Sequence, residues 1–122
     1  MNIIKSINSI MKENMLPYAY VQWNGAVKYP YIIGEYIESP TNTEDGRWEY
    51  DFILTITNKG TWEQVEKLKG KIIDIFPKIY GNRITTDNGV VVIFYSHSLT
   101  VPTGTEEYQR EEIHLKVKEW RE

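Results

Sequence analysis

Residues 47–57 have the sequence Arg-Trp-Glu-Tyr-Asp-Phe-Ile-Leu-Thr-Ile-Thr, in which large apolar side chains recur at every second position. Successive side chains of an extended chain point to opposite faces, so Phe52, Leu54 and Ile56 share one face and more polar residues share the other. This alternation predicts a strand that is buried on one side. Trp48 lies on the face of Phe52, which makes it a candidate for the core as well as for an interface.

The chain before this strand predicts a helix and a second strand. Apolar residues recur at helical spacing over residues 2–14, and Pro17 marks the end of the helix. The segment Tyr29–Glu38 is rich in Tyr and Ile and is typical of a strand. The polar residues Ser39–Gly46 predict a loop that joins it to the strand at 47–57 as a hairpin.

The chain after this strand predicts a second helix and two further strands. Thr61 followed by Gln64 fits a capping box at a helix start, and Pro77 ends the helix. The continuous apolar run Val90–Tyr95 predicts a central strand that is buried on both faces. After a polar excursion, Ser96–Glu107, the last segment alternates as a half-exposed strand. Its apolar residues are Ile113, Leu115 and Val117.

The predicted order is therefore helix, two strands, helix, two strands. Two strands that follow each other directly along the chain favour an antiparallel hairpin, and two helices suffice to cover one face of such a sheet. With 122 residues, the chain has the length of one domain, residues 1–122. The sequence predicts an α+β fold: a two-layer sandwich with a mainly antiparallel sheet and both helices on one face.

Composition excludes several functional classes. The chain has no cysteine, so disulfides, cysteine zinc sites and cysteine nucleophiles are excluded. Its net charge of −3 argues against a specific nucleic-acid binder. No apolar run approaches the length of a membrane span, and the first residues lack the pattern of a signal peptide. We expect no membrane association and a cytoplasmic location when the protein is made.

The residues that carry catalysis in other proteins show no recognisable pattern here. His97 and His114 lack the spacing of metal ligands, and His114 is expected to be a solvated strand residue. The carboxylates Glu111 and Glu112, like the pair Glu106–Glu107, are expected on a solvated loop and strand edge, because they have no calcium-loop spacing. No phosphate-binding glycine motif is present. We expect no catalytic residue, no metal and no cofactor, hence no enzyme.

Aromatic and acidic residues near the end of the chain are candidates for an interface. Trp120 lies among charged residues, where a Trp side chain is typical of a binding surface. Tyr108 follows the acidic pair Glu106 and Glu107. Together with Trp48, these residues form the predicted interface set.

Three stretches support a resemblance to a known family. They are Tyr31-Ile-Ile-Gly-Glu-Tyr36 before a polar loop, the strand from Trp48 to Ile56, and Thr61-Trp62 at the start of a Lys-rich helix. With the order of elements, they resemble the tail-terminator (tail completion) proteins of long-tailed bacteriophages. The resemblance is one of pattern and covers nearly the whole chain. It maps no individual residue onto a family binding motif.

The resemblance implies a virion structural protein that forms a hexameric ring on the tail tube. The implied partners are further copies of the chain, the tail-tube protein and the head-completion protein. The implied location is the virion, and the host cytoplasm during assembly. A ring subunit needs two different complementary surfaces, and the loops Ser39–Gly46 and Ser96–Glu107 are candidate arms between subunits.

Two other functions remain open from the sequence. One is a small prophage or bacterial protein-binding module that is not an enzyme and uses its aromatic surface. The other is a small hydrolase, which would require Glu106, Glu107, Glu111 or Glu112 to converge with His97 in a pocket.

Overall fold

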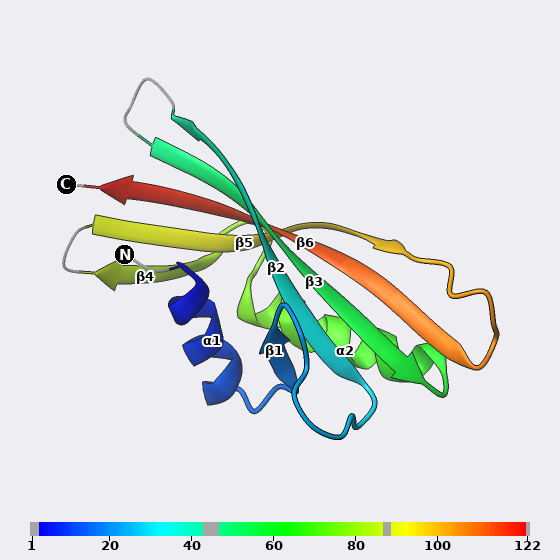
Figure 1. The fold of residues 1–122 in the computed structure, drawn as a ribbon. Helices are drawn as coiled ribbons and strands as arrows, with labels where there is room; N and C mark the ends of the chain where they lie inside the picture. The colour runs from blue at the N-terminus through cyan, green and yellow to red at the C-terminus, as the bar shows by residue number, and fades with distance from the viewer. Residues whose placement is uncertain (1–2, 43–46, 87–88, 122) are drawn as a thin grey trace.

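The computed structural model describes residues 3–42, 47–86 and 89–121 (Figure 1). The two helices and six strands confirm the α+β class. In chain order the elements are α1 Ile3–Glu13, β1 Tyr18–Tyr20, β2 Tyr31–Asn42, β3 Arg47–Lys59, α2 Trp62–Ile75, β4 Asn82–Thr86, β5 Gly89–Thr100 and β6 Tyr108–Arg121.

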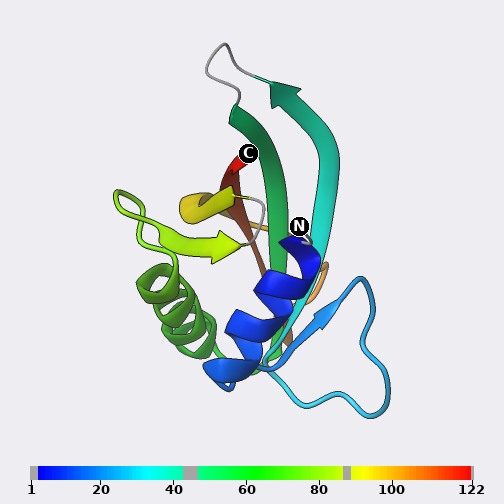
Figure 2. The same ribbon diagram turned by 90° about the vertical axis from the view of Figure 1, so that its left-hand side faces the viewer.

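All six strands belong to one sheet with the order β1-β2-β3-β6-β5-β4. The central ladder pairs β3 with β6 from Arg47↔Trp120 to Lys59↔Tyr108. Four of the five strand pairs are antiparallel, and β1 pairs with β2 in parallel. The sheet curls from β2 round to β4 (Figure 2). The predicted mainly antiparallel sheet agrees with this pairing, whereas a two-layer sandwich is met only in part, because the sheet curls.

Both helices contribute to a single core on one face of the sheet. The buried side chains of α1 are Ile3, Ile7 and Met11, and they belong to the same cluster as those of α2. The strands supply alternate residues, such as Phe52 of β3 and Leu115 of β6, that are fully buried. The alternation predicted for 47–57 and for the last strand is thus confirmed. We call the helix-covered side of the sheet the inner face.

The start and end of α2 follow the predicted signals. The Thr61 backbone N–H donates to Gln64 Oε1 at 3.1 Å, which is half of a capping box. The helix ends at Ile75, one residue before the buried Phe76 and two before Pro77. The Phe76 carbonyl then accepts a hydrogen bond from the backbone of Tyr95 in β5. This contact ties the end of α2 to the sheet.

Two predicted loops are shorter in the structure. β2 continues to Asn42, so residues 39–42 are strand, while residues 43–46 lie outside the described residues. β5 continues to Thr100, which reduces the excursion before β6 to residues 101–107. Both loops were predicted too long, because polar residues usually indicate loops. Here the long strands β3 and β6 offer backbone partners that hold polar residues in the ladder.

The apolar run Val90–Tyr95 was predicted to be a central strand buried on both faces, and this is wrong. β5 lies next to the edge strand β4, and β3 and β6 occupy the centre. Val91 and Ile93 are fully buried on the inner face, whereas Phe94 is only half-buried. The physical reason is that both helices pack on the inner face, so the alternate residues of β5 stay partly accessible.

Candidate interaction surface

The sheet has a second face, which we call the outer face. In β6 the odd-numbered residues from Gln109 to Glu119 are buried, and the even-numbered ones are half-buried. The even-numbered residues therefore point to the outer face. Over the described part of the chain, the two helices pack into the core on the other side. The outer face is thus a broad surface of half-exposed side chains.

An aromatic cluster lies at the Tyr108 end of the outer face. The ring centroids of Tyr29 and Tyr108 are 6.0 Å apart, and those of Tyr29 and Tyr31 are 5.7 Å apart. Trp23 follows at 5.6 Å from Tyr31. The connection between β1 and β2 carries Trp23 and Tyr29 to this position. The sequence analysis missed this cluster, because only the tertiary fold brings residues 23–31 beside Tyr108.

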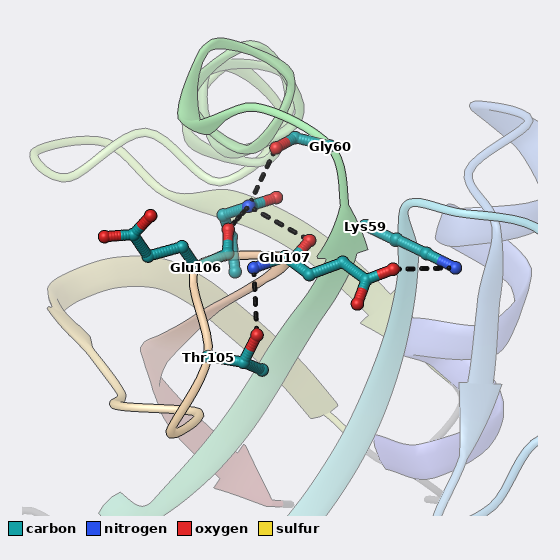
Figure 3. A network of polar contacts seen from close by, with 6 residues as sticks. Lys59, Gly60, Thr105, Glu106 and Glu107 are labelled. Atoms are coloured by element: carbon teal, nitrogen blue, oxygen red, sulfur yellow. Dashed lines mark hydrogen bonds and ion pairs between the residues drawn. The ribbon is translucent and has the colours of Figure 1, made fainter.

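The predicted acidic pair lies beside this cluster, and Figure 3 shows the polar contacts of the pair. Lys59 Nζ is 3.1 Å from Glu107 Oε1 and 5.7 Å from the ring centroid of Tyr108. The hydrogen bond from Lys59 to Glu107, together with the carboxylate charge, raises the pKa of Lys59. The Glu106 carboxylate points away from Lys59 in Figure 3. Glu107 and Tyr108 thus share one charged and aromatic corner, and Glu106 points to solvent.

Hydrogen bonds from side chains to the backbone hold the loop that carries the acidic pair. Gln109 Nε2 donates to the Gly60 carbonyl at 2.8 Å and to the Glu106 carbonyl at 3.2 Å. The Glu107 backbone N–H donates to Thr105 Oγ1 at 3.1 Å. Asn58 Nδ2 in turn donates to Gln109 Oε1 at 3.1 Å. The loop 101–107 is therefore attached to the start of α2 by the buried amides of Asn58 and Gln109.

The two histidines stack in the middle of the outer face. Their ring centroids are 4.4 Å apart with an angle of 17° between the ring planes. A register shift in β5 between Tyr95 and His97 places His97 directly opposite His114. His114 Nε2 also lies 2.7 Å from Glu112 Oε1. The expectation that His114 is solvated is therefore wrong, since its side chain is only 21% exposed and has two partners.

Glu111 was expected on a solvated strand edge, and this is also wrong. It points into the inner face, where its side chain is 4% exposed and Oε2 lies 3.1 Å from Lys69 Nζ. Thr100 Oγ1 donates to its other oxygen at 2.9 Å. Neighbouring strand residues point to opposite faces, so Glu111 and Glu112 are separated by the sheet. Glu112 shares the outer face with His97, whereas Glu111 does not.

The rest of the described chain adds no site of obvious chemistry. A groove of about 680 Å³ lies between the start of α2 and the loop 101–107. Its lining is mainly Thr, Gly and apolar residues, including Trp62, and Glu106 is its carboxylate. Within residues 3–42, 47–86 and 89–121, no group of three or more His, Asp or Glu side chains is placed to hold a metal ion. Neither described helix is long and apolar enough to span a membrane.

The five predicted interface residues do not form one patch. Trp120 lies on the outer face opposite Val90, whereas Trp48 packs against the core on the inner face. Tyr108 and Trp120 lie at the two ends of β6, which at about 3.3 Å per residue places them about 40 Å apart. The structure thus brings Tyr108 and Glu107 together and separates both from Trp120.

A turn between α2 and β4 presents two further apolar residues that the sequence analysis did not select. Ile79 and Tyr80 are each 84% exposed. Adjacent large apolar side chains at this exposure are uncommon on a surface that contacts only water. The turn is therefore a second candidate contact point, apart from the outer face.

Among the comparisons with known proteins, only the comparison of structures finds a similarity. No family model and no curated protein sequence matches the chain. Among solved structures, it is similar to a chain in the structure described as "Virion of native gene transfer agent (GTA) particle", with a TM-score of 0.69. The match covers 90% of this chain and 83% of that chain at 7% sequence identity. This chain therefore has the fold of a protein found in a gene transfer agent virion.

Proposed function

We propose that the chain is a non-enzymatic structural subunit of a phage-like virion. In that particle, copies of the chain form a ring that caps the tail tube and joins it to the head connector. The observation that carries the proposal is the similarity to a gene transfer agent virion chain over 90% of this chain. The order of elements supports it, because the chain contains the helix, strand pair, helix and strand pair on which the resemblance to tail terminators rests, with the short strands β1 and β4 in addition.

The distribution of side chains is consistent with a ring subunit. A closed ring requires two different surfaces on each copy, since every subunit contacts its neighbours head to tail. The Tyr108 end of the outer face carries the aromatic cluster, and the opposite end carries Trp120. Aromatic residues of this kind are frequent hot spots of protein interfaces.

The molar mass in solution tests the ring. Light scattering after size exclusion should give a species of about six times the 14.4 kDa chain mass, alone or on addition of tail tubes. Trp120→Ala should shift this species to smaller mass, whereas Lys67→Ala, an exposed change on α2, should not. A chain that forms no ring-sized species under either condition would refute the proposal.

A protein-binding module is the second candidate, and the exposed Ile79–Tyr80 turn favours it. Such a module stays small in solution and uses the turn as an anchor in a partner. Ile79→Ser with Tyr80→Ser would then abolish capture of a partner by the immobilised chain while the far-ultraviolet circular dichroism stays unchanged. Ring formation that is insensitive to this double change would favour the virion role instead.

A further inference from the structure

The Ile79–Tyr80 turn has a backbone that is fixed by hydrogen bonds. The Gly81 N–H donates to the Pro77 carbonyl at 2.9 Å. Asn82 Nδ2 donates to the Ile75 carbonyl at 3.1 Å, which ties the start of β4 to the end of α2. The turn therefore holds two large apolar side chains, each 84% exposed, in a defined position.

The groove between the start of α2 and the loop 101–107, which we call the loop groove, also has a fixed shape. Thr103 Oγ1 lies 2.8 Å from the Thr105 carbonyl oxygen and 3.0 Å from the Tyr108 carbonyl oxygen. The volume of about 680 Å³ falls within the usual range of binding pockets, about 300–1,000 Å³. Trp62 and Tyr108 give the loop groove aromatic walls.

The turn and the loop groove carry opposite charges. Lys78 and Arg83 lie on either side of the turn and are exposed, and Asp74 lies one turn back on α2. The net charge around the turn is therefore positive. Among the described residues that line the loop groove, Glu106 alone carries a charge. A basic apolar turn and an acidic aromatic groove are complementary in charge as well as in apolar character.

The turn and the loop groove lie at the two ends of α2 (Figure 1). The groove adjoins the first residues of the helix, and the turn follows its last residue. With 14 residues at a rise of about 1.5 Å, α2 is about 21 Å long. The turn of one copy therefore cannot reach the groove of the same copy, whereas a second copy can supply it.

We propose that the Ile79–Tyr80 turn of one copy inserts into the loop groove of the next copy. The two apolar side chains pack against the aromatic walls, and Lys78 and Arg83 approach Glu106. The contact joins two different surfaces, so it is heterologous, and heterologous contacts form a ring when the rotation closes. This inference rests on the proposed ring and names the two surfaces by which its neighbouring subunits meet.

Three physical features favour this contact. Both surfaces are held in shape before they meet, so little conformational entropy is lost on association. A Tyr side chain buries about 150–250 Å² and is a frequent hot spot, and Tyr80 has most of its surface free to bury. In a closed ring each copy is held at its turn and at its groove, so a single contact of modest affinity suffices.

Mixing two complementary variants tests the contact. The turn variant, Ile79→Ser with Tyr80→Ser, keeps the loop groove, and the groove variant, Trp62→Ser with Glu106→Lys, keeps the turn. In sedimentation equilibrium the wild-type chain should self-associate, and each variant alone should do so at least about tenfold more weakly. An equimolar mixture should give a dimer of one copy of each variant and nothing larger, because it contains a single intact pair of surfaces.

The control for the mixing experiment is Ile37→Ser. Ile37 is 40% exposed and lies on β2, outside the turn and the loop groove, so this variant should self-associate like the wild type. A mixture that contains no mixed dimer would overturn the proposal. Equal weakening by Ile37→Ser and by the turn variant would overturn it as well.

Charge reversal is a second test. Glu106→Lys alone should weaken self-association, and Lys78→Glu in the same chain should restore part of it, because opposite charges then meet again. Glu35→Lys, an exposed change on β2, is the control and should have no effect. Absence of any recovery would contradict the proposed pairing.

The same variants separate this contact from the proposed ring. A ring-sized species that persists in the turn variant would leave the ring intact and refute this contact alone. A mixed dimer from the two variants, with no ring from the wild type even on tail tubes, would support the contact and refute the ring.

Discussion

The ion pair between Lys69 and Glu111 joins α2 to the sheet, and Lys69→Met tests its contribution. Lys69 Nζ is 3.1 Å from Glu111 Oε2, and the two side chains are 19% and 4% exposed. Methionine preserves most of the aliphatic stem of lysine but removes the charge. In the variant the buried carboxylate of Glu111 still accepts a hydrogen bond from the Thr100 hydroxyl at 2.9 Å, but it has lost its charged partner.

The expected loss in the free energy of unfolding of Lys69→Met follows from the burial of the Lys69–Glu111 ion pair. Removing one partner of a buried ion pair costs about 3–5 kcal/mol, because the other charge stays desolvated. Lys69 retains some contact with water, so we expect the lower value, about 3 kcal/mol. With a urea m value of about 2 kcal/mol per molar, the unfolding midpoint should fall by about 1.5 M.

Urea unfolding followed by tryptophan fluorescence measures this loss. Lys67→Met is the control, since Lys67 is exposed on the same helix, and its midpoint should stay close to that of the wild type. Replacing both partners, Lys69→Met with Glu111→Met, should recover most of the stability, because no buried charge is then left unpaired. Indistinguishable midpoints for Lys69→Met and Lys67→Met would refute the reasoning.

The same pair predicts a dependence on alkaline pH. Burial lowers the pKa of Lys69, but the hydrogen bond to Glu111 and the charge of that carboxylate outweigh it, so the pKa is raised above 10.5. A group whose pKa is raised on folding contributes its full stability below the unfolded value and loses it as pH rises through the folded value. The stability difference between wild type and Lys69→Met should therefore be constant near neutral pH and shrink above about pH 10.5.

Three further substitutions should change the urea midpoint in defined directions. Asn58→Ala removes the Nδ2 donor to Gln109 Oε1 at 3.1 Å and to the Thr61 carbonyl at 3.0 Å, and should cost about 2 kcal/mol; an unchanged midpoint would mean that water replaces these bonds. Gly34→Ala places a Cβ against the Tyr18 hydroxyl and 2.8 Å from a Phe52 ring carbon and should cost about 1–3 kcal/mol; a stabilised variant would show that both rings yield freely. Tyr18→Phe should stabilise the chain by about 1 kcal/mol, because the buried Tyr18 hydroxyl has no hydrogen-bond partner within the described residues; a destabilised variant would reveal such a partner.

The candidate surface was predicted less well than the fold. The sequence selected Trp120 and Tyr108, which lie on the outer face, because aromatic residues among charges are typical of interfaces. It also selected Trp48, whose place on the inner face follows from its sharing the face of Phe52. It could not find the aromatic cluster or the stacked pair His97 and His114, since both join residues that are far apart in the chain. Pairs such as Glu35 and Ile53 become neighbours only through the register of the strands.

The sequence by itself determined the two helices and the middle of the four long strands, but not β1, β4 or the ends of β2 and β5. The alternation at 47–57, the capping residues Thr61 and Gln64, and the stop at Pro77 depend on local backbone chemistry, so they could be recognised without the fold. Only the tertiary structure decided the order of the strands and the partners of the polar residues. Glu111 has the same sequence neighbours whether it faces water or Lys69, and its burial is set by pairing β6 between β3 and β5 with α2 on one side. The physical reason is that local patterns fix which side chains share a face, whereas contacts between distant segments fix what that face meets.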